Sequence, residues 1–443
     1  MPDLLAGAAT ADITPAPGVM LDGYGARTTP SQGVHDPLMA RVLVFKQGEQ
    51  TAAIVSADAL GMHPWITNEI RDRAHAAHGI DPEGVIVAAT HDHAAPFGLR
   101  AGMFARLDET LAQTFVDKVC LAMVSAWDTR RPATLGFASA TIDTISMNRR
   151  DPAGPNDTEM RVVLIDSATG PVASIVNFAC HATILNATNL QLSGEFPGAA
   201  ARFLQRETSA PCVYLNGACG DVNPAWITQD YPSVERAGQI VGGHALRLIA
   251  EMRALVPGQR THNIRWNEFP DVPHLGRSVT PNLRVTRREV EIPPRVFEDD
   301  EAYASLVDAA RAAAEAAATG SAERREAAAR ISRYEGERWA AAWARRGERQ
   351  ERTEVQALRL GHGLSLLALP GEFFAETAAK VREAVGGGDL LVACYANDYV
   401  GYVVPADAYD AGGYEPGVTF FEPAAEAIIR NASIDLLGGV ASA

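Results

Sequence analysis

The chain has 443 residues, of which 47% are hydrophobic, so it is long enough to bury a large core as one large domain or two closely joined ones. Its formal net charge of −15 argues against a nucleic-acid or anionic-membrane partner, because no segment concentrates enough positive charge to bind phosphate groups. The five cysteines are an odd number and lie mostly in apolar runs, which indicates small buried side chains in a reducing compartment rather than a disulfide framework.

The amino-terminal residues MPDLLAGAATADITP contain no basic segment followed by a long apolar stretch, so the sequence predicts no signal peptide. No stretch is apolar over the length needed to span a bilayer. We therefore expect a cytoplasmic protein without a stable membrane anchor.

Short apolar runs alternate with helix-like segments over most of the length, a pattern typical of α/β proteins. Residues 40–48 and 50–60 predict a β-hairpin across Gly48, and residues 63–79 predict an amphipathic helix that Gly79 ends. Continuous apolar runs predict strands covered on both faces at VIVAA, ASIVNFA, CVYLN, LSLLAL and LLVACYA. The expected fold is therefore α/β, with mixed β-sheets layered with helices.

Residues 299–347 differ from the rest because they are rich in alanine and in charged residues. The breakers Thr319, Gly320 and Ser321 near the middle predict two long helices joined by a tight turn, an antiparallel helical hairpin. We expect a single domain over residues 1–443 with this hairpin as an insertion. The first interpretation is a solvated excursion that only packs on its parent domain. The alternative is an arm for homo-oligomerisation.

Polar side chains follow the ends of these apolar runs. VIVAA leads to THDH, which contains His91 and His93, and ASIVNFAC leads to His181. CVYLN is followed by GDVNP, LSLLALP by Glu372, and LLVACYAN by DYVGY. In open α/β sheets, ligands bind beyond the carboxyl ends of strands. His91 and His93 are two residues apart, so an extended chain would point both to the same side.

Together with His91, the distant His181 and Glu372 would complete a set of two histidines and one carboxylate, the ligand type of a catalytic zinc with an open position. The alternative is that each histidine is a hydrogen-bonded structural residue, and spacing alone does not decide between them. His35, which precedes a strand, is a further candidate to face such a site.

The motifs occur in a recognisable order. They read ADITPAPGVMLDGYG, GVHDPLMARVLVF, VSADALGM, THDHAAP, SMNRRD, NFACHATIL, SGEFPG, NGACGDVNP, LPGEFFAE and YVVPADAYDAGGYE. This order resembles that of the neutral/alkaline (non-lysosomal) ceramidase family, and the motifs cover nearly the whole chain.

The resemblance implies a set of zinc ligands: His91, His181, Glu372 and Tyr402. It implies further active-site residues: His93, Arg149 and Tyr414. The spacing between Tyr402 and Tyr414 matches that of the two tyrosines of the family. The tyrosine ligand is implied by the resemblance alone.

The chain also departs from the family pattern. Asn223 stands where family ceramidases have serine in GDVSPN, and Glu195 stands where they usually have aspartate. Members that act on ceramide carry a secretion signal and a carboxyl-terminal immunoglobulin-like domain, which we do not find here, and the helical hairpin is unlike them. These departures argue against ceramide as the substrate and leave the zinc site in place.

The sequence therefore predicts a zinc-dependent hydrolase that cleaves the amide bond of a soluble, small N-acyl compound with metal-activated water. His93 is expected to move a proton to the leaving group, and Arg149 and Tyr414 to donate hydrogen bonds to the substrate. The amide of Asn223 is not a plausible nucleophile, so we expect it to donate a hydrogen bond. The alternatives are a zinc-dependent esterase, lactonase or glycosidase, and a ligand-binding homologue that has lost catalysis.

Overall fold

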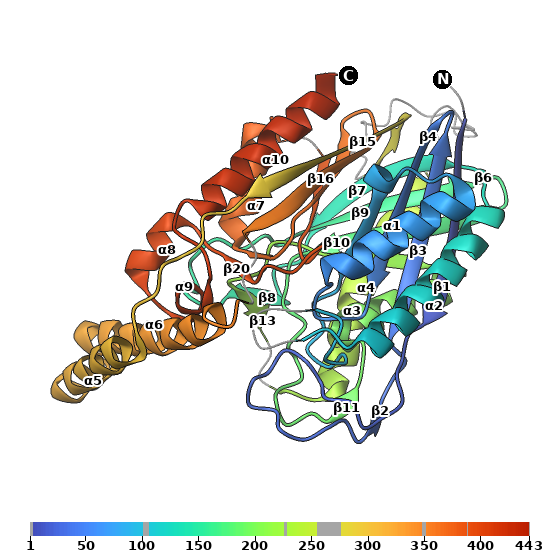
Figure 1. The fold of residues 1–443 in the computed structure, drawn as a ribbon. Coiled ribbons are helices and arrows are strands. Elements are labelled where there is room, and N and C mark those ends of the chain that lie inside the picture. Colours follow the sequence, from blue (N-terminus) through green and yellow to red (C-terminus); the bar gives the residue numbers. More distant parts are fainter. Residues whose placement is uncertain are drawn as a thin grey trace, which may run out of the picture.

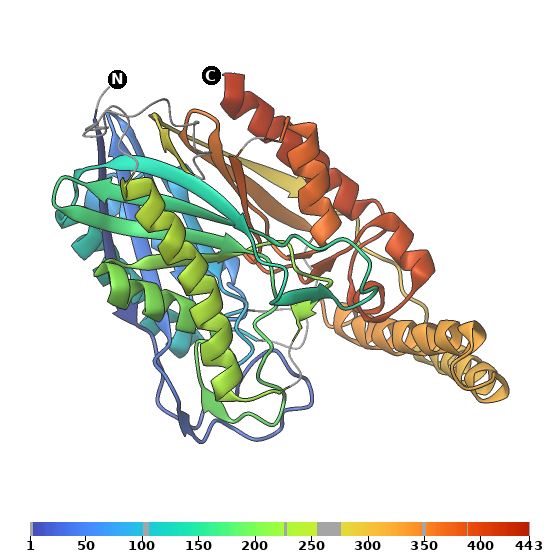
Figure 2. The same ribbon diagram turned by 180° about the vertical axis from the view of Figure 1, so that it is seen from behind.

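The computed structural model describes residues 3–100, 106–225, 228–254, 276–347, 351–387 and 389–442. Three β-sheets form the body of the molecule, and helices cover their outer faces (Figure 1). The view from behind shows the same arrangement and the paired helices that project from the body (Figure 2). The predicted α/β class, with mixed sheets, layered helices and a helical hairpin, is confirmed.

The first sheet has the strand order β5-β4-β3-β1-β6. Its strands are β1 (Leu4–Asp12), β3 (Met39–Gln47), β4 (Gln50–Ala57), β5 (Val85–Ala89) and β6 (Arg131–Pro132). Strands β3 and β4 form the predicted antiparallel hairpin, whereas β4 and β5 run parallel. Helices α1 (Pro64–His78) and α2 (Glu109–Asp128) pack on its outer face. Gly79 ends α1 with a left-handed φ of 65°, as predicted.

The second sheet has the order β12-β10-β9-β7-β14. Its strands are β7 (Thr134–Thr141), β9 (Glu159–Ser167), β10 (Gly170–Phe178), β12 (Cys212–Asn216) and β14 (Gly276–Val279). Only β10 and β12 pair in parallel. Helices α3 (Glu195–Thr208) and α4 (Tyr231–Ala254) cover this sheet.

The third sheet has the order β15-β16-β17-β19. Its strands are β15 (Pro281–Glu291), β16 (Arg352–Gly361), β17 (Leu364–Ala368) and β19 (Asp389–Ala393), and again only the last pair, β17 and β19, is parallel. Helices α7 (Ala375–Ala384) and α10 (Ala425–Ser442) lie on its outer side.

The three sheets share one core. Leu43 of β3, Ile175 of β10 and Leu366 of β17 are all fully buried in the same apolar cluster. Their chain neighbours point the other way, so that Val42 and Leu367 are buried beneath the helices. Both faces of each strand are therefore covered, which explains the continuous apolar runs in the sequence.

Each sheet ends in a parallel pair of strands, and short ladders lie beyond these ends. The ladders pair β2 (Gly33–Val34) with β11 (Gln191–Leu192), β8 (Ser146–Asn148) with β13 (Val222–Pro224), and β18 (Glu372–Phe373) with β20 (Tyr402–Val403). The remaining short elements are the 3₁₀ helix η1 (Pro82–Gly84) and the helices α8 (Ala406–Ala411) and α9 (Tyr414–Val418). No helix in the described part of the chain is long and apolar enough to cross a membrane.

The helical hairpin consists of α5 (Asp300–Ala316) and α6 (Ala322–Ala344), which pack against each other. The far end of α6 projects from the body, and its other end packs on α9 (Figure 1). Helices α6 and α9 approach closely at Gly336 of α6, where an added Cβ would lie 2.9 Å from the carbonyl carbon of Gly417 in α9. Glu337 beside it is 3% exposed and accepts hydrogen bonds from Arg295 and Arg333. The base of the hairpin is thus buried against the body of the molecule. The division of the chain into one domain with an insertion stays a prediction.

We expect Gly336→Ala to lower the free energy of unfolding by about 1–3 kcal/mol, because the new methyl group would overlap the backbone of α9. Gly243→Ala in α4 is the matched control, since an added Cβ there meets nothing within 4 Å. That change should stabilise the helix by about 0.5–1 kcal/mol. Chemical denaturation of both variants checks this; equal effects of the two changes would contradict the close packing of α6 on α9.

Candidate metal centre

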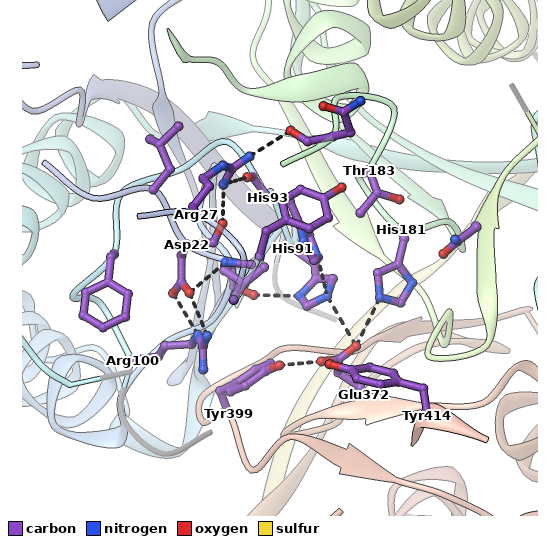
Figure 3. A pocket seen from close by; sticks show the side chains of 18 of the residues that line it. Asp22, Arg27, His91, His93, Arg100, His181, Thr183, Glu372, Tyr399 and Tyr414 are labelled. Carbon is purple, nitrogen blue, oxygen red and sulfur yellow. Dashed lines mark hydrogen bonds and ion pairs between the residues drawn. The ribbon is translucent and has the colours of Figure 1, made fainter. Parts of the chain in front are cut away.

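Three buried side chains meet beyond the ends of β5, β10 and β17, one from each sheet. Nε2 of His181 lies 3.2 Å from Oε2 of Glu372, and Nε2 of His91 lies 3.4 Å from the same oxygen (Figure 3). All three side chains are at most 2% exposed. The structure therefore brings together three of the four predicted ligands.

In both histidines a backbone carbonyl binds the outer nitrogen, Nδ1, which is the ring nitrogen that points away from Glu372. Nδ1 of His91 donates to the carbonyl oxygen of Leu60 at 2.9 Å, and Nδ1 of His181 donates to that of Val222 at 3.1 Å. A ring that carries its single proton on Nδ1 directs the lone pair of Nε2 at the carboxylate of Glu372, an arrangement of acceptors that needs a cation or a proton between them. Histidine ligands of metals have this same backbone or carboxylate partner on their outer nitrogen. The residues therefore fit a divalent metal of the zinc type.

His93 lies beside this cluster but differs from it. Its Nε2 is 3.3 Å from Nε2 of His91, so that His91, His93 and His181 form a candidate three-histidine metal group within 4.8 Å. Among the described residues, however, Nδ1 of His93 has no hydrogen-bond partner. It faces the backbone of Gly23, where an added Cβ would lie 2.3 Å from Nδ1. His93 therefore lacks the outer partner that the other two rings have.

The local backbone explains how His91 reaches the site. The residue has a φ of +61°, which a non-glycine residue rarely adopts and which is common at functional sites. Its ring stacks on Tyr395 with centroids 3.8 Å apart, and Asp92 pairs with Ala182 to bring the two histidine segments together. His91 and His93 do face the same site, as predicted, but through this left-handed turn and not through an extended chain.

Arg149 connects several other predicted residues. It donates from Nε to Glu415 at 2.8 Å, from Nη1 to Oδ1 of Asn223 at 3.2 Å, and from Nη2 to the hydroxyl of Tyr402 at 3.0 Å. The ring of Tyr414 lies edge-on to that of Tyr402, with centroids 5.8 Å apart. Four residues predicted for the site therefore contact one another and line the same cavity: Arg149, Asn223, Tyr402 and Tyr414.

The ladder of β18 and β20, in which Tyr402 is the partner of Glu372, places Tyr402 next to the candidate metal centre. Burial raises the pKa of Tyr402 well above 10 despite the neighbouring Arg149 guanidinium, so the phenol stays protonated unless a metal ion lies beside it. Its hydroxyl is held by Arg149, and its role as a ligand stays a prediction.

Sequence reasoning missed several polar residues that complete the site. The hydroxyl of Tyr399 donates a hydrogen bond to Oε1 of Glu372. Arg100 forms a buried ion pair with Asp22 at 2.7 Å, and Arg27 donates to the carbonyl oxygen of His93 at 2.6 Å. Asp22 lies within the quoted motif ADITPAPGVMLDGYG, but nothing local indicated its partner.

His35 was a candidate for the site, and this prediction is wrong. Its ring stacks on Tyr231 with centroids 3.6 Å apart, and Nδ1 lies 2.9 Å from Oδ2 of Asp36. The ladder of β2 and β11 holds the residues beside it, away from the converging histidines. The stack and the carboxylate give His35 a structural role.

The converging side chains line a cavity of about 620 Å³. Its electrostatics favour a cation. Burial alone would raise the pKa of Glu372, but the neighbouring His91 and His181 hold that pKa well below 4.5. Burial lowers the pKa of His181 to about 4. At neutral pH the cavity therefore combines the ionised carboxylate of Glu372 with the neutral imidazole of His181, the protonation states that a metal requires.

Glu195 lies behind the site at the start of α3, where it is fully buried with a φ of +53°. Burial raises its pKa from 4.5 to about 7. Between these values the folded state binds more protons than the unfolded state, so the stabilisation present below pH 4.5 is lost as the pH rises to about 7. A rise of this size corresponds to roughly 3 kcal/mol.

We expect Glu195→Gln to remove this pH dependence. Between pH 4.5 and pH 7 the wild type should lose about 3 kcal/mol of unfolding free energy relative to the variant, because only the wild type must ionise a buried carboxyl group. Glu207→Gln, which changes an exposed carboxylate of the same helix, is the control. Denaturation curves across this pH range measure the effect, and parallel curves for all three proteins would refute it.

Residues 4–224 match the family model described as "Neutral/alkaline non-lysosomal ceramidase, N-terminal". The chain is 28% identical over 224 residues to the neutral ceramidase of Oryza sativa subsp. japonica, a match that covers 45% of this chain and 28% of that protein. It is 21% identical over 483 residues to the neutral ceramidase of Pseudomonas aeruginosa, covering 97% of this chain and 71% of the relative. The matched part thus spans less than a third of the length of the rice protein.

The crystal structure of neutral ceramidase from Pseudomonas aeruginosa has a similar fold. It superposes with a TM-score of 0.74 at 19% sequence identity, over 100% of this chain and 75% of the other. The motif order, the family model and the shared fold agree. The chain belongs to the neutral/alkaline non-lysosomal ceramidase family.

Proposed function

We propose that this protein is a zinc-dependent hydrolase that cleaves the amide bond of a small, water-soluble N-acyl compound. The observation that carries the proposal is the convergence of Nε2 of His91 and Nε2 of His181 on Glu372, with both outer nitrogens fixed by backbone carbonyls. These three residues, with Tyr402, would hold the metal. A bound zinc ion supplies a water molecule activated as nucleophile at neutral pH and polarises the substrate carbonyl.

We assign Arg149 and Asn223 to binding the carbonyl oxygen of the substrate. Oδ1 of Asn223 accepts from Arg149, which leaves the NH₂ group of the side chain as a donor toward the cavity. Tyr414 lines the same cavity and adds a hydroxyl. Donors fixed in advance around a developing oxyanion stabilise the transition state without reorganisation.

His93 is the residue we assign to proton transfer. Burial and the neighbouring His91 lower its pKa well below 6.5, so its ring is neutral at pH 7 and accepts a proton before it donates one. Since its Nδ1 lacks a fixed partner in the described part of the chain, the ring is less constrained than those of His91 and His181. That difference supports a role beside the metal rather than on it.

The lining of the cavity supports a polar substrate and not ceramide. Besides the tyrosines, the proposed ligands and the residues assigned to catalysis, the lining includes six polar or charged residues: Asp22, Arg27, Arg100, Thr183, Asn186 and Gln229. Small-molecule sites use such groups to orient a ligand by hydrogen bonds. Neutral ceramidases are the relatives of this chain, but Asn223 replaces the serine of the family motif.

Removal of metal tests the proposal. We expect purified protein to hydrolyse at least one amide in a panel of chromogenic N-acyl amides, esters and glycosides, and to lose this activity on treatment with 1,10-phenanthroline. Stoichiometric Zn²⁺ should restore it, because the ligand set stays folded around the site. Turnover of esters or glycosides without amides would favour the alternative hydrolases, and activity that survives complete metal removal would exclude zinc chemistry.

A further inference from the structure

The helical hairpin reaches the cavity through one residue. Trp339 of α6 lines the same cavity as His181 and Glu372. It is 48% exposed, a high value for so large an apolar side chain. An exposed aromatic side chain at the edge of a cavity is more often part of a binding surface than a single aromatic side chain exposed elsewhere on a protein.

The main chain holds Trp339 in place. Gly336, one turn earlier, lies against Gly417 of α9, and Glu337 is tied to Arg295 and Arg333. The Trp339 ring also touches the opposite side of the mouth, because a Cβ added to Gly25 would lie 3.1 Å from Cη2 of the ring. The side chain is thus supported from two directions and still partly exposed.

The loop on that opposite side is itself connected to the site. Arg27 ties it to the carbonyl oxygens of Asp22 and His93 at 2.7 and 2.6 Å. A second half-exposed aromatic residue, Tyr414 of α9, lines the cavity as well and is 43% exposed. The mouth therefore combines an aromatic surface from the hairpin and α9 with the polar interior around the candidate metal centre.

We propose that Trp339 is a specificity-determining residue, which binds an alkyl or aromatic group of the substrate while the polar interior binds the amide. This inference rests on the proposed function for the position of the amide. The substrate class is then an N-acyl compound with one apolar substituent that extends to the mouth. A flat indole ring contributes contact area at little cost in side-chain entropy, which suits it to such a group.

Three amides test the proposal: N-octanoylglycine, with its chain on the acyl side, N-octylacetamide, with its chain on the amine side, and N-acetylglycine, without a chain. For Trp339→Ala we expect the KM of one of the two octyl compounds to rise by about 10-fold or more, with kcat unchanged. The KM for N-acetylglycine should stay within about twofold. Trp339→Phe should keep most of the affinity. Gly25→Ala, which pushes on the ring, should raise the same KM to a smaller extent.

Controls separate this role from a structural one. Trp65→Ala removes an indole that is 38% exposed on α1 and lies outside the cavity, and it should leave all three KM values unchanged. The thermal midpoint and metal content of each variant show whether the fold is kept. Equal changes for all three substrates, or no change for either octyl compound, would overturn the proposal.

Calorimetric binding of N-octylacetamide and N-octanoylglycine distinguishes failure of this inference from failure of the proposed function. If the wild type hydrolyses no amide but binds one octyl compound through Trp339, the proposed function fails and the binding role stands. If the wild type binds neither compound, or if Trp339→Ala binds both as tightly as the wild type, the binding role is refuted.

Discussion

His181→Ala should reduce the zinc content from about one ion per chain to less than about a tenth, and amide hydrolysis should fall with it. The ring supplies one of the two nitrogen lone pairs directed at Glu372, and its removal would leave His91 as the remaining nitrogen ligand of the proposed set. Even the loss of an outer-shell partner costs about 10–100-fold in metal affinity, so the loss of a ligand should cost more. Elemental analysis after dialysis measures the occupancy directly.

Two further variants make this result specific. His75→Ala removes a histidine of α1 whose Nδ1 lies 3.2 Å from the carbonyl oxygen of Ile80 and which is not among the residues that line the cavity, so it should keep full occupancy. His93→Ala should keep most of the metal and lose activity, because His93 lacks the outer partner typical of a ligand. Full occupancy in His181→Ala would remove the basis of the proposed function. Complete loss of metal in His93→Ala would move His93 into the ligand set, as the three-histidine group in the structure also allows.

The site could be located from the sequence because its residues follow buried strands. Each of the apolar runs that precede His91, His181 and Glu372 forms a strand, and the carboxyl ends of these strands meet at one place. The parallel pair at the edge of each sheet causes this convergence, since it directs successive strand ends to the same side. The pattern of polar residues after apolar runs was therefore informative.

The partners of these residues could not be found in the same way. Tyr399 lies 27 positions from Glu372, and Arg100 lies 78 positions from Asp22; both pairs form through loops whose path depends on the packing of whole sheets. His91 adopts its left-handed φ where its ring stacks on Tyr395, a residue still more remote in the sequence. Trp339 was missed for a further reason: within an alanine-rich helix its position is one of many exposed ones, and only the packing of α6 on α9 brings it to the cavity.

The neighbours of Asn223 determine which end of its side-chain amide is available to a substrate. Pairing of β13 with β8 places it opposite Met147, and the preceding residue, Val222, holds both the backbone and the ring of His181. Arg149 occupies its carbonyl oxygen, so the NH₂ group is the part that remains for a substrate. A serine at this position would present a hydroxyl to the same place.

Asn223→Ala should lower kcat by about 10²–10³, the usual cost of losing one donor to an oxyanion, while the zinc content stays unchanged. Asn223→Ser should recover much of the rate, because a hydroxyl also donates a hydrogen bond. Asn223→Asp is the sharper control: it keeps the size and the contact with Arg149 but replaces the donor by an acceptor, so it should be as slow as alanine. Steady-state kinetics with metal analysis of the three variants checks this order. Should alanine be as fast as the wild type, Asn223 only holds the GDVNP turn beside His181, and the donors to the substrate carbonyl must be Arg149 and Tyr414 alone.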